Sequence, residues 1–159
     1  MERNIYIVVF ILIVQLFFSC KDQTTSPESF DDLHLSFVSA SIGANLMPNV
    51  PPDPIGCQII LLAENKNQTN IISNLSITQA DVYLVSSDQR LGTITFTSDW
   101  DGRLEPMERD TVYLTKIIGQ TSLFNIQCNK YVYLKLLVQN EFKNSNTFKT
   151  DSLFFGCVY

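Results

Sequence analysis

Side chains that could bind a cation gather in one short acidic segment. Five carboxylates lie within twelve residues there: Asp99, Asp101, Glu105, Glu108 and Asp110. Their hard oxygen atoms suit calcium. However, the spacing of a twelve-residue calcium loop is absent, and Arg103 and Arg109 lie among the acids. We therefore expect a solvated acidic loop and no bound metal.

Trp100 lies between two of these carboxylates, Asp99 and Asp101. An exposed tryptophan is a common anchor at protein interfaces, so Asp99, Trp100 and Asp101 form a candidate interaction loop. Alternatively, the indole ring folds back over the end of the domain. The sequence leaves both arrangements open.

Catalytic chemistry has little support elsewhere in the chain. His34 is the only histidine of the 159 residues, which excludes metal sites with several histidines and relays between two imidazoles. Its position in an alternating segment predicts a solvated side chain. The sequence contains no nucleophile elbow, phosphate-binding loop, dinucleotide fingerprint or zinc-protease motif. We expect a protein that is not an enzyme and needs no cofactor.

Charge excludes a further class of partner. Sixteen acidic side chains oppose eleven Lys and Arg, so the formal net charge is -5. Nucleic-acid binding depends on clustered basic side chains that neutralise phosphates, so we expect no nucleic-acid partner. The hydrophobic share of 45% indicates a folded domain rather than a disordered chain.

The first twenty residues differ from the rest. An apolar run from Ile5 to Phe18 is broken only by Gln15. Fourteen helical residues extend about 21 Å, which is less than the ~30 Å hydrocarbon core of a bilayer. The run therefore suits the hydrophobic region of a signal peptide better than a membrane span.

The junction Phe17-Phe18-Ser19-Cys20 resembles the lipobox of bacterial lipoproteins, in which a small residue precedes an invariant cysteine. Ser19 and Cys20 match, whereas Phe17 and Phe18 are bulkier than the residues usual there. The resemblance implies a signal peptide over residues 1–19 and acyl chains on Cys20. It also implies an anchor in the bacterial envelope, in the outer membrane, facing the periplasm or the cell surface. An ordinary secretory signal and an uncleaved anchor are the alternatives.

Polar residues follow Cys20. The stretch from Lys21 to Ser29 contains no apolar residue and predicts a flexible tether. We therefore divide the chain into a signal peptide (1–19), a lipidated tether (20–31) and a folded domain (32–159).

Within the folded domain, apolar residues recur with a period of two, which predicts β-strands. Seven strands are expected, at residues 33–38, 57–63, 75–85, 93–97, 110–118, 131–138 and 147–159. Short strands separated by polar turns predict an all-β, antiparallel β-sandwich. A small closed β-barrel is the alternative.

Residues 74–114 resemble the Ig-like sandwich modules of bacterial envelope proteins. In those modules a hairpin leads to a Leu-x-Pro-Gly turn, which Leu104-Glu105-Pro106 fits. Met107 stands where glycine is usual, so we expect a turn without a left-handed residue. The resemblance implies an Ig-like fold and specifies no function.

Three cysteines remain after Cys20, in a compartment where disulfides persist. If consecutive strands reverse direction, Cys57, Cys128 and Cys157 gather at one end of the domain. Cys128 and Cys157 flank the last turn almost symmetrically, so we expect them to form a disulfide, with Cys57 as a buried free thiol. A Cys57–Cys128 bridge is the alternative.

Two functions remain. The first is a non-enzymatic, lipid-anchored envelope lipoprotein that binds other envelope proteins as an adhesion or scaffold module. The second is an anchored carrier that holds a small apolar ligand inside the domain, lined by the aromatic residues Phe96, Phe124, Tyr131, Tyr133, Phe154 and Phe155. A filled core favours the first function, whereas an internal cavity above ~300 Å³ favours the second.

Overall fold

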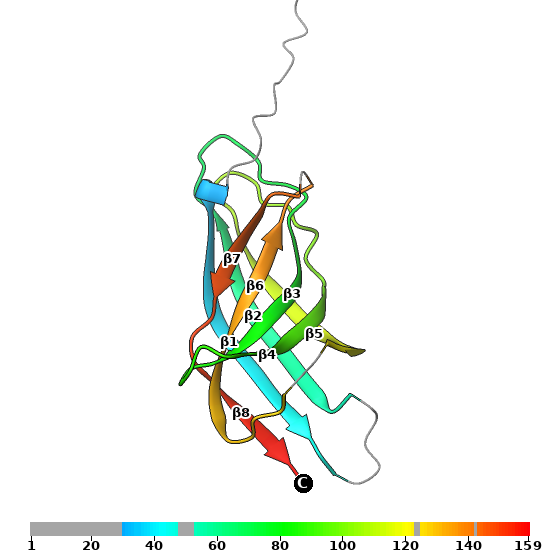
Figure 1. The fold of residues 1–159 in the computed structure, drawn as a ribbon. Helices are drawn as coiled ribbons and strands as arrows, with labels where there is room; N and C mark the ends of the chain where they lie inside the picture. The colour runs from blue at the N-terminus through cyan, green and yellow to red at the C-terminus, as the bar shows by residue number, and fades with distance from the viewer. Residues whose placement is uncertain (1–29, 48–52, 123–124, 142) are drawn as a thin grey trace, which may run out of the picture.

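The computed structural model describes residues 30–47, 53–122, 125–141 and 143–159. The predicted signal peptide, Cys20 and nearly all of the predicted tether lie outside these residues, as does Phe124. A short 3-10 turn, η1 (Phe30–Asp32), precedes the strands (Figure 1). The strands are β1 (Leu33–Asn45), β2 (Ile55–Asn65), β3 (Ser76–Leu84), β4 (Arg90–Ser98), β5 (Arg109–Ser122), β6 (Lys130–Gln139), β7 (Ser145–Lys149) and β8 (Leu153–Val158).

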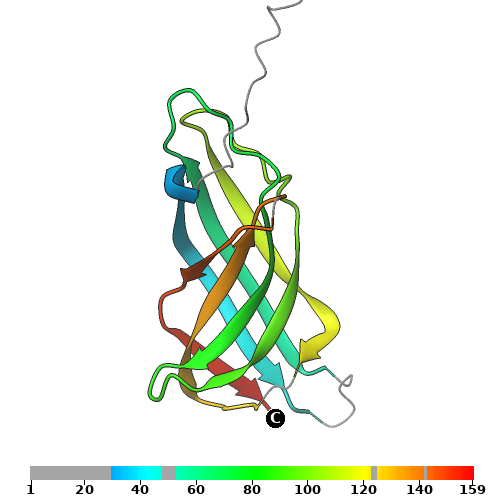
Figure 2. The ribbon, with the colours of Figure 1, turned by 45° about the horizontal axis from the view of Figure 1, so that its top comes forward.

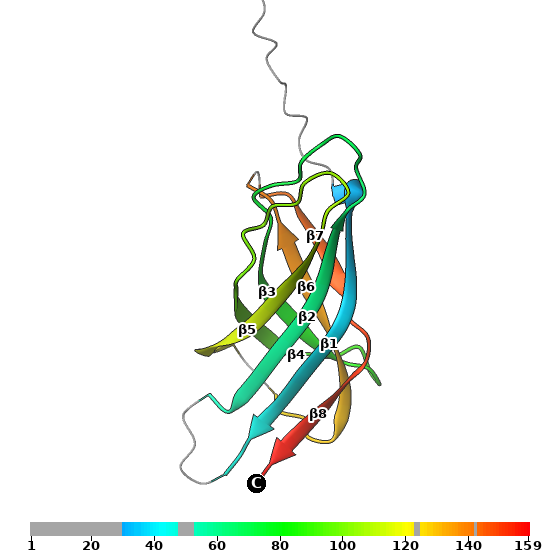
Figure 3. The same ribbon diagram turned by 180° about the vertical axis from the view of Figure 1, so that it is seen from behind.

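Seven of these strands form a closed barrel (Figures 1 and 3). Their order is β3-β4-β5-β2-β1-β8-β6, and β6 pairs with β3 to close the ring, while β7 extends the sheet beside β6. β1 and β8 run parallel, whereas the other pairs in the ring are antiparallel. The all-β class and the alternative of a small barrel are therefore confirmed. The predicted antiparallel sandwich is wrong.

Each strand of the ring pairs along both edges. For example, β4 lies between β3 and β5, and residues 42–44 of β1 lie between β2 and β8 (Figure 2). The alternation of apolar residues determines which face of a strand is buried, but it does not determine the strand's neighbours. That is why the sequence could not distinguish a sandwich from a barrel.

The bounds of the first and last strands also differ from prediction. β1 continues to Asn45 because a bulge between Phe37 and Ser39 shifts its register and turns Ile42 and Ala44 inward. The predicted strand at 147–159 is interrupted near Thr150. There the Leu134 N–H donates to the Thr150 hydroxyl at 3.0 Å, and the Thr150 N–H donates to the Leu134 carbonyl at 3.0 Å.

Apolar side chains fill the interior of the barrel. Residues with less than 2% exposure include Ile59, Leu61, Ile94, Leu134 and Phe155. Of the described aromatics proposed for an internal ligand site, Phe96 and Phe155 belong to this packed core, whereas Tyr131 and Phe154 are exposed. Tyr133 is covered but packs against other side chains on the outside of the barrel, as its contacts below show.

Candidate functional site

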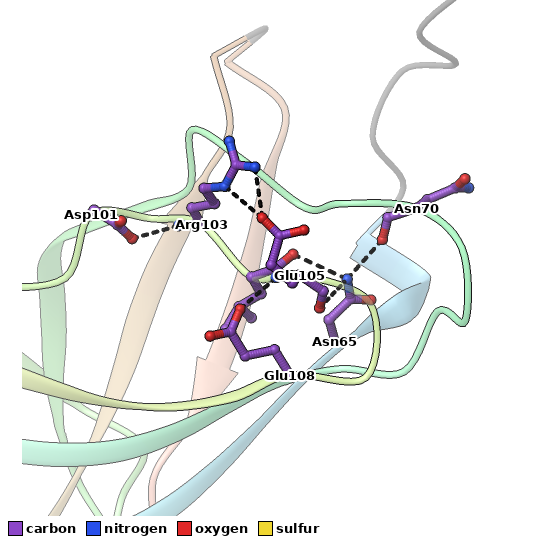
Figure 4. A network of polar contacts seen from close by, with 7 residues as sticks. Asn65, Asn70, Asp101, Arg103, Glu105 and Glu108 are labelled. Carbon is purple, nitrogen blue, oxygen red and sulfur yellow. Dashed lines mark hydrogen bonds and ion pairs between the residues drawn. The ribbon is translucent and has the colours of Figure 1, made fainter.

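The predicted interaction loop lies between β4 and β5, at the end of the barrel where β1 begins. Asn65 is buried at the end of β2, and its side chain forms hydrogen bonds with the backbone of this loop (Figure 4). Its side-chain amide donates to the carbonyls of Asn70, Leu104 and Glu105 at 2.8, 3.2 and 3.1 Å, and its oxygen accepts from the Asn67 N–H at 2.9 Å. Sequence reasoning missed Asn65, because the polar residues after β2 resembled an ordinary strand end.

The acidic side chains of the loop accept hydrogen bonds from other residues of the same loop. Asp101 accepts from the Arg103 N–H at 2.9 Å, and the Arg103 guanidinium donates to Glu105 at 2.6 and 3.0 Å. The Glu105 N–H in turn donates to the Glu108 carboxylate at 2.6 Å (Figure 4). Among the described residues, no group of three or more Cys, His, Asp or Glu is arranged to hold a metal ion. These carboxylates shape the loop.

Trp100 packs against the hydrophobic core from this loop and is only partly exposed. Its Nε1–H is buried, and the described part of the chain offers it no hydrogen-bond partner. A pocket of about 440 Å³ lies beside the ring, lined by Asp99, Trp100, Asp101, Arg103, Glu105, Glu108, Asp110 and Thr111. The structure thus brings Asp99, Trp100 and Asp101 together, with the ring folded back over the barrel.

Met107 adopts the left-handed conformation, with φ at 61°. The expectation of a turn without a left-handed residue is therefore wrong. Pro106 and Met107 occupy the positions where such turns carry Pro and Gly. The Met107 N–H donates to the Asn67 carbonyl at 3.0 Å, and the Glu108 N–H donates to the Glu105 carbonyl at 3.1 Å. These bonds compensate for the strain of a side chain at positive φ.

We expect Met107→Gly to raise the free energy of unfolding by about 1 kcal/mol, because glycine has no Cβ to strain at positive φ. Little packing is lost, since Met107 is 57% exposed. Urea unfolding of Met107→Gly and of its control Met107→Ala measures the gain. Equal stability of the two variants would contradict the strain argument.

Charged side chains also pair at this end. Glu64 on β2 contacts Lys66 and also Arg109, the latter at 2.9 Å. The hydrogen bond from the Lys66 ammonium lowers the pKa of Glu64 below its usual value, and the Arg109 guanidinium acts in the same direction. His34 on β1, which lies opposite Glu64 on β2, is exposed as expected.

A stacked pair of tyrosines lies on the outer face of β3 and β6. The ring centroids of Tyr83 and Tyr133 are 5.3 Å apart, and the Lys149 ammonium lies 3.9 Å from the Tyr133 centroid. The Tyr133 hydroxyl donates to Asp88, which raises the pKa of Tyr133 to about 12. Lys135 lies 4.5 Å from the Tyr83 centroid. The tyrosines are thus occupied by contacts within the chain.

Cys128 and Cys157 form a disulfide in the structure, with their Cα atoms 5.5 Å apart. This is the pairing expected from the strand arrangement, and the alternative Cys57–Cys128 bridge is not formed. Cys57 is a buried free thiol. Burial raises the pKa of Cys57 to about 12.

The end of the barrel opposite Leu33, which we call the far end, carries an apolar surface that sequence reasoning missed. Eleven large hydrophobic side chains are exposed in the described residues, and seven of them belong to segments at or near this end: Met47, Val85, Ile118, Tyr131, Phe154, Val158 and Tyr159. A period of two marks such residues only as outward-facing. Their gathering depends on which strands end together.

A groove of about 630 Å³ crosses the outer face at the far end, and three glycines line it. Gly43 on β1 lies opposite Gly56 on β2 and opposite Gly156 on β8. We call these three residues the glycine row. Among the described residues that line the groove, Lys116 is the one with a charged side chain, and its ammonium pairs with Asp53.

Gly43 and Gly56 should respond differently to an added methyl group. A Cβ on Gly43 would lie 2.8 Å from the Gly156 carbonyl oxygen, whereas a Cβ on Gly56 would meet nothing within 4 Å. We expect Gly43→Ala to lower the free energy of unfolding by about 1–3 kcal/mol and Gly56→Ala to raise it by about 0.5–1 kcal/mol. Thermal unfolding of both variants checks this. A shift of both in the same direction would contradict the assignment of the close contact.

Together these features describe an all-β barrel with a charged, hydrogen-bonded loop at one end and a mainly apolar groove at the other. No protein-family model matches the sequence, and a comparison with curated proteins finds no significant match. Within the described ranges, no helix is both long and apolar enough to cross a membrane.

Proposed function

We propose that this protein is a lipid-anchored, non-enzymatic binding module of the bacterial envelope, which presents the far end of its barrel to another protein. The observation that carries the proposal is the gathering of seven exposed hydrophobic side chains at that end. Exposed apolar side chains that gather in one region of a surface are typical of protein interaction sites.

The position of the N-terminus supports this role. The described chain enters the barrel at Leu33, opposite the far end (Figure 1). An anchor on Cys20, connected by the tether, would therefore leave the apolar end directed away from the membrane. The packed interior supports a surface-binding module over a carrier, because side chains occupy the space that an internal ligand would need.

Cys20→Ala should abolish acylation and release the protein from membranes, because a lipid on that cysteine is the proposed anchor. Labelling with an acyl probe and fractionation of cells measure both effects. Cys57→Ala, which alters a buried thiol, is the matched control and should keep the label. A Cys20→Ala protein that still labels and sediments with membranes would refute the anchor.

Binding through the far end is tested separately. Ile118, which is 80% exposed, is replaced by Glu, and Val38, which is 57% exposed and lies on β1 outside the groove, is replaced by Glu as a control. In photo-crosslinking in cells, the crosslinked products between this protein and other proteins should disappear with Ile118→Glu and remain with Val38→Glu. Equal crosslinking in both variants would show that the far end is not the binding surface.

A further inference from the structure

The side of the barrel where β1 begins carries two stretches of strand edge that pair with no strand of the described chain. β1 pairs with β2 from Leu33 to Ala44, but its other edge pairs with β8 only from Ile42 onward. β7 pairs with β6 along one edge. The start of β1 and β7 lie on the same side of the molecule (Figures 1 and 2). The N–H and C=O groups along such edges can pair with a further strand.

The two free edges leave room for one strand between them. Nearly all Cα atoms of β1 lie more than 8 Å from those of β7. Paired strands lie about 4.8 Å apart, so a strand between two others needs a spacing of about 9.6 Å. A hollow of about 210 Å³ lies at this position, and residues of both strands line it: Phe30, Leu33, His34, Leu35, Val138, Asn146, Thr147 and Phe148.

The hydrophobic core is incompletely covered beside this hollow. Leu35 and Phe37 on β1 pack against the core but are only partly buried, as is Phe148 on β7. Their neighbours on β2 are fully buried: Ala63 lies opposite Leu35, and Leu61 lies opposite Phe37. A strand added at the hollow would therefore remove apolar side chains of the core from water.

The free edges and the hollow together specify the chemistry of the occupant. A strand that lies between β1 and β7 must have both of its own edges unpaired. The strands of a second copy are already paired along at least one edge and do not meet this condition. Residues 21–29, which precede the hollow in this chain, contain no apolar side chain to cover it. An extended segment with alternating apolar residues meets both conditions.

We propose that the gap between residues 33–37 of β1 and β7 binds an extended segment of another protein, which adds a strand to the barrel. The backbone of this segment pairs with the free edges of β1 and β7, and its inward-facing apolar side chains cover the hollow. The site lies at the opposite end of the barrel from the far end, so it goes beyond the proposed function and does not depend on it.

The test uses the full chain in detergent and a synthetic peptide of alternating valine and threonine with a glutamate at each end. The glutamates keep the peptide soluble, and they avoid general attraction to a chain whose net charge is -5. We expect the peptide to slow hydrogen exchange about tenfold or more at the amides of residues 33–37 that point to the free edge, because pairing protects them.

Two controls separate strand pairing from other contacts. The same peptide with an N-methyl group on every second residue cannot donate along one edge and should leave exchange unchanged. Thr147→Trp fills the hollow from β7 and should abolish the effect, whereas Thr97→Trp on β4 should keep it. Both threonines are exposed, and thermal unfolding of each variant shows that it is folded.

Three outcomes would overturn the proposal. The first is exchange that the peptide does not slow, and the second is equal slowing by the methylated peptide. The third is protection of the same amides in the free chain that disappears when residues 21–29 are replaced by glycine and serine, since this chain would then fill its own gap. Ile118→Glu at the far end should not alter the effect of the peptide, so the two binding surfaces are tested independently.

Discussion

Lys116→Met should lower the free energy of unfolding by about 3 kcal/mol, because it leaves the Asp53 carboxylate buried without its cation. The side chains of Lys116 and Asp53 are 3% and 6% exposed. Asp53 also accepts from the Gly119 N–H at 2.7 Å, where β5 bulges away from β4. The pair therefore fastens the segment before β2 to the bulge in β5.

Two controls separate a buried unpaired charge from a general loss of packing. The double variant Lys116→Met and Asp53→Leu replaces the ion pair by an apolar pair. It should recover most of the lost stability, because neither buried charge then remains. Arg103→Met removes an exposed partner of Glu105 and should cost far less, since water screens that pair. Urea unfolding of the variants measures the effects. A double variant no more stable than Lys116→Met would contradict the prediction.

Removal of the disulfide is expected to be the other large effect. Replacing both Cys128 and Cys157 by Ser should lower the free energy of unfolding by about 3.5 kcal/mol, because the crosslink spans 29 residues and restricts the unfolded chain. It also ties the start of β6 to the end of β8, whose parallel pairing with β1 covers only residues 155–158.

A reducing agent offers the same comparison without substitution. The unfolding midpoint of the native chain should fall on reduction toward that of the double Ser variant. Cys57→Ala is the control and should keep the full response to reductant, because burial raises the pKa of the Cys57 thiol to about 12 and keeps it protonated and unreactive. Loss of the response in Cys57→Ala would indicate that Cys57, rather than Cys157, pairs with Cys128.

Much of the strand content was predictable from local pattern. Alternation at Val132, Leu134, Leu136 and Val138 marks a buried face, and these side chains are buried in the barrel. The disulfide was predictable for a related reason. Strands joined by a short connection usually pair, so Cys128 and Cys157, placed symmetrically about that connection, come together.

Turn geometry was less predictable. The left-handed Met107 departs from the residue preference of its turn because contacts from distant residues compensate for the strain. Its N–H bonds to Asn67, forty positions earlier in the chain. A local rule has no access to such a partner.

By itself, the sequence determined that the domain is all-β, which side chains turn inward, and which two cysteines could pair, because a two-residue period and short connections act over a few residues. Only the tertiary structure decided that the ring of strands closes, that Asn65 holds the acidic loop, and that Gly43, Gly56 and Gly156 form one row. These features depend on register between strands far apart in the chain, and register is set by how whole faces pack together.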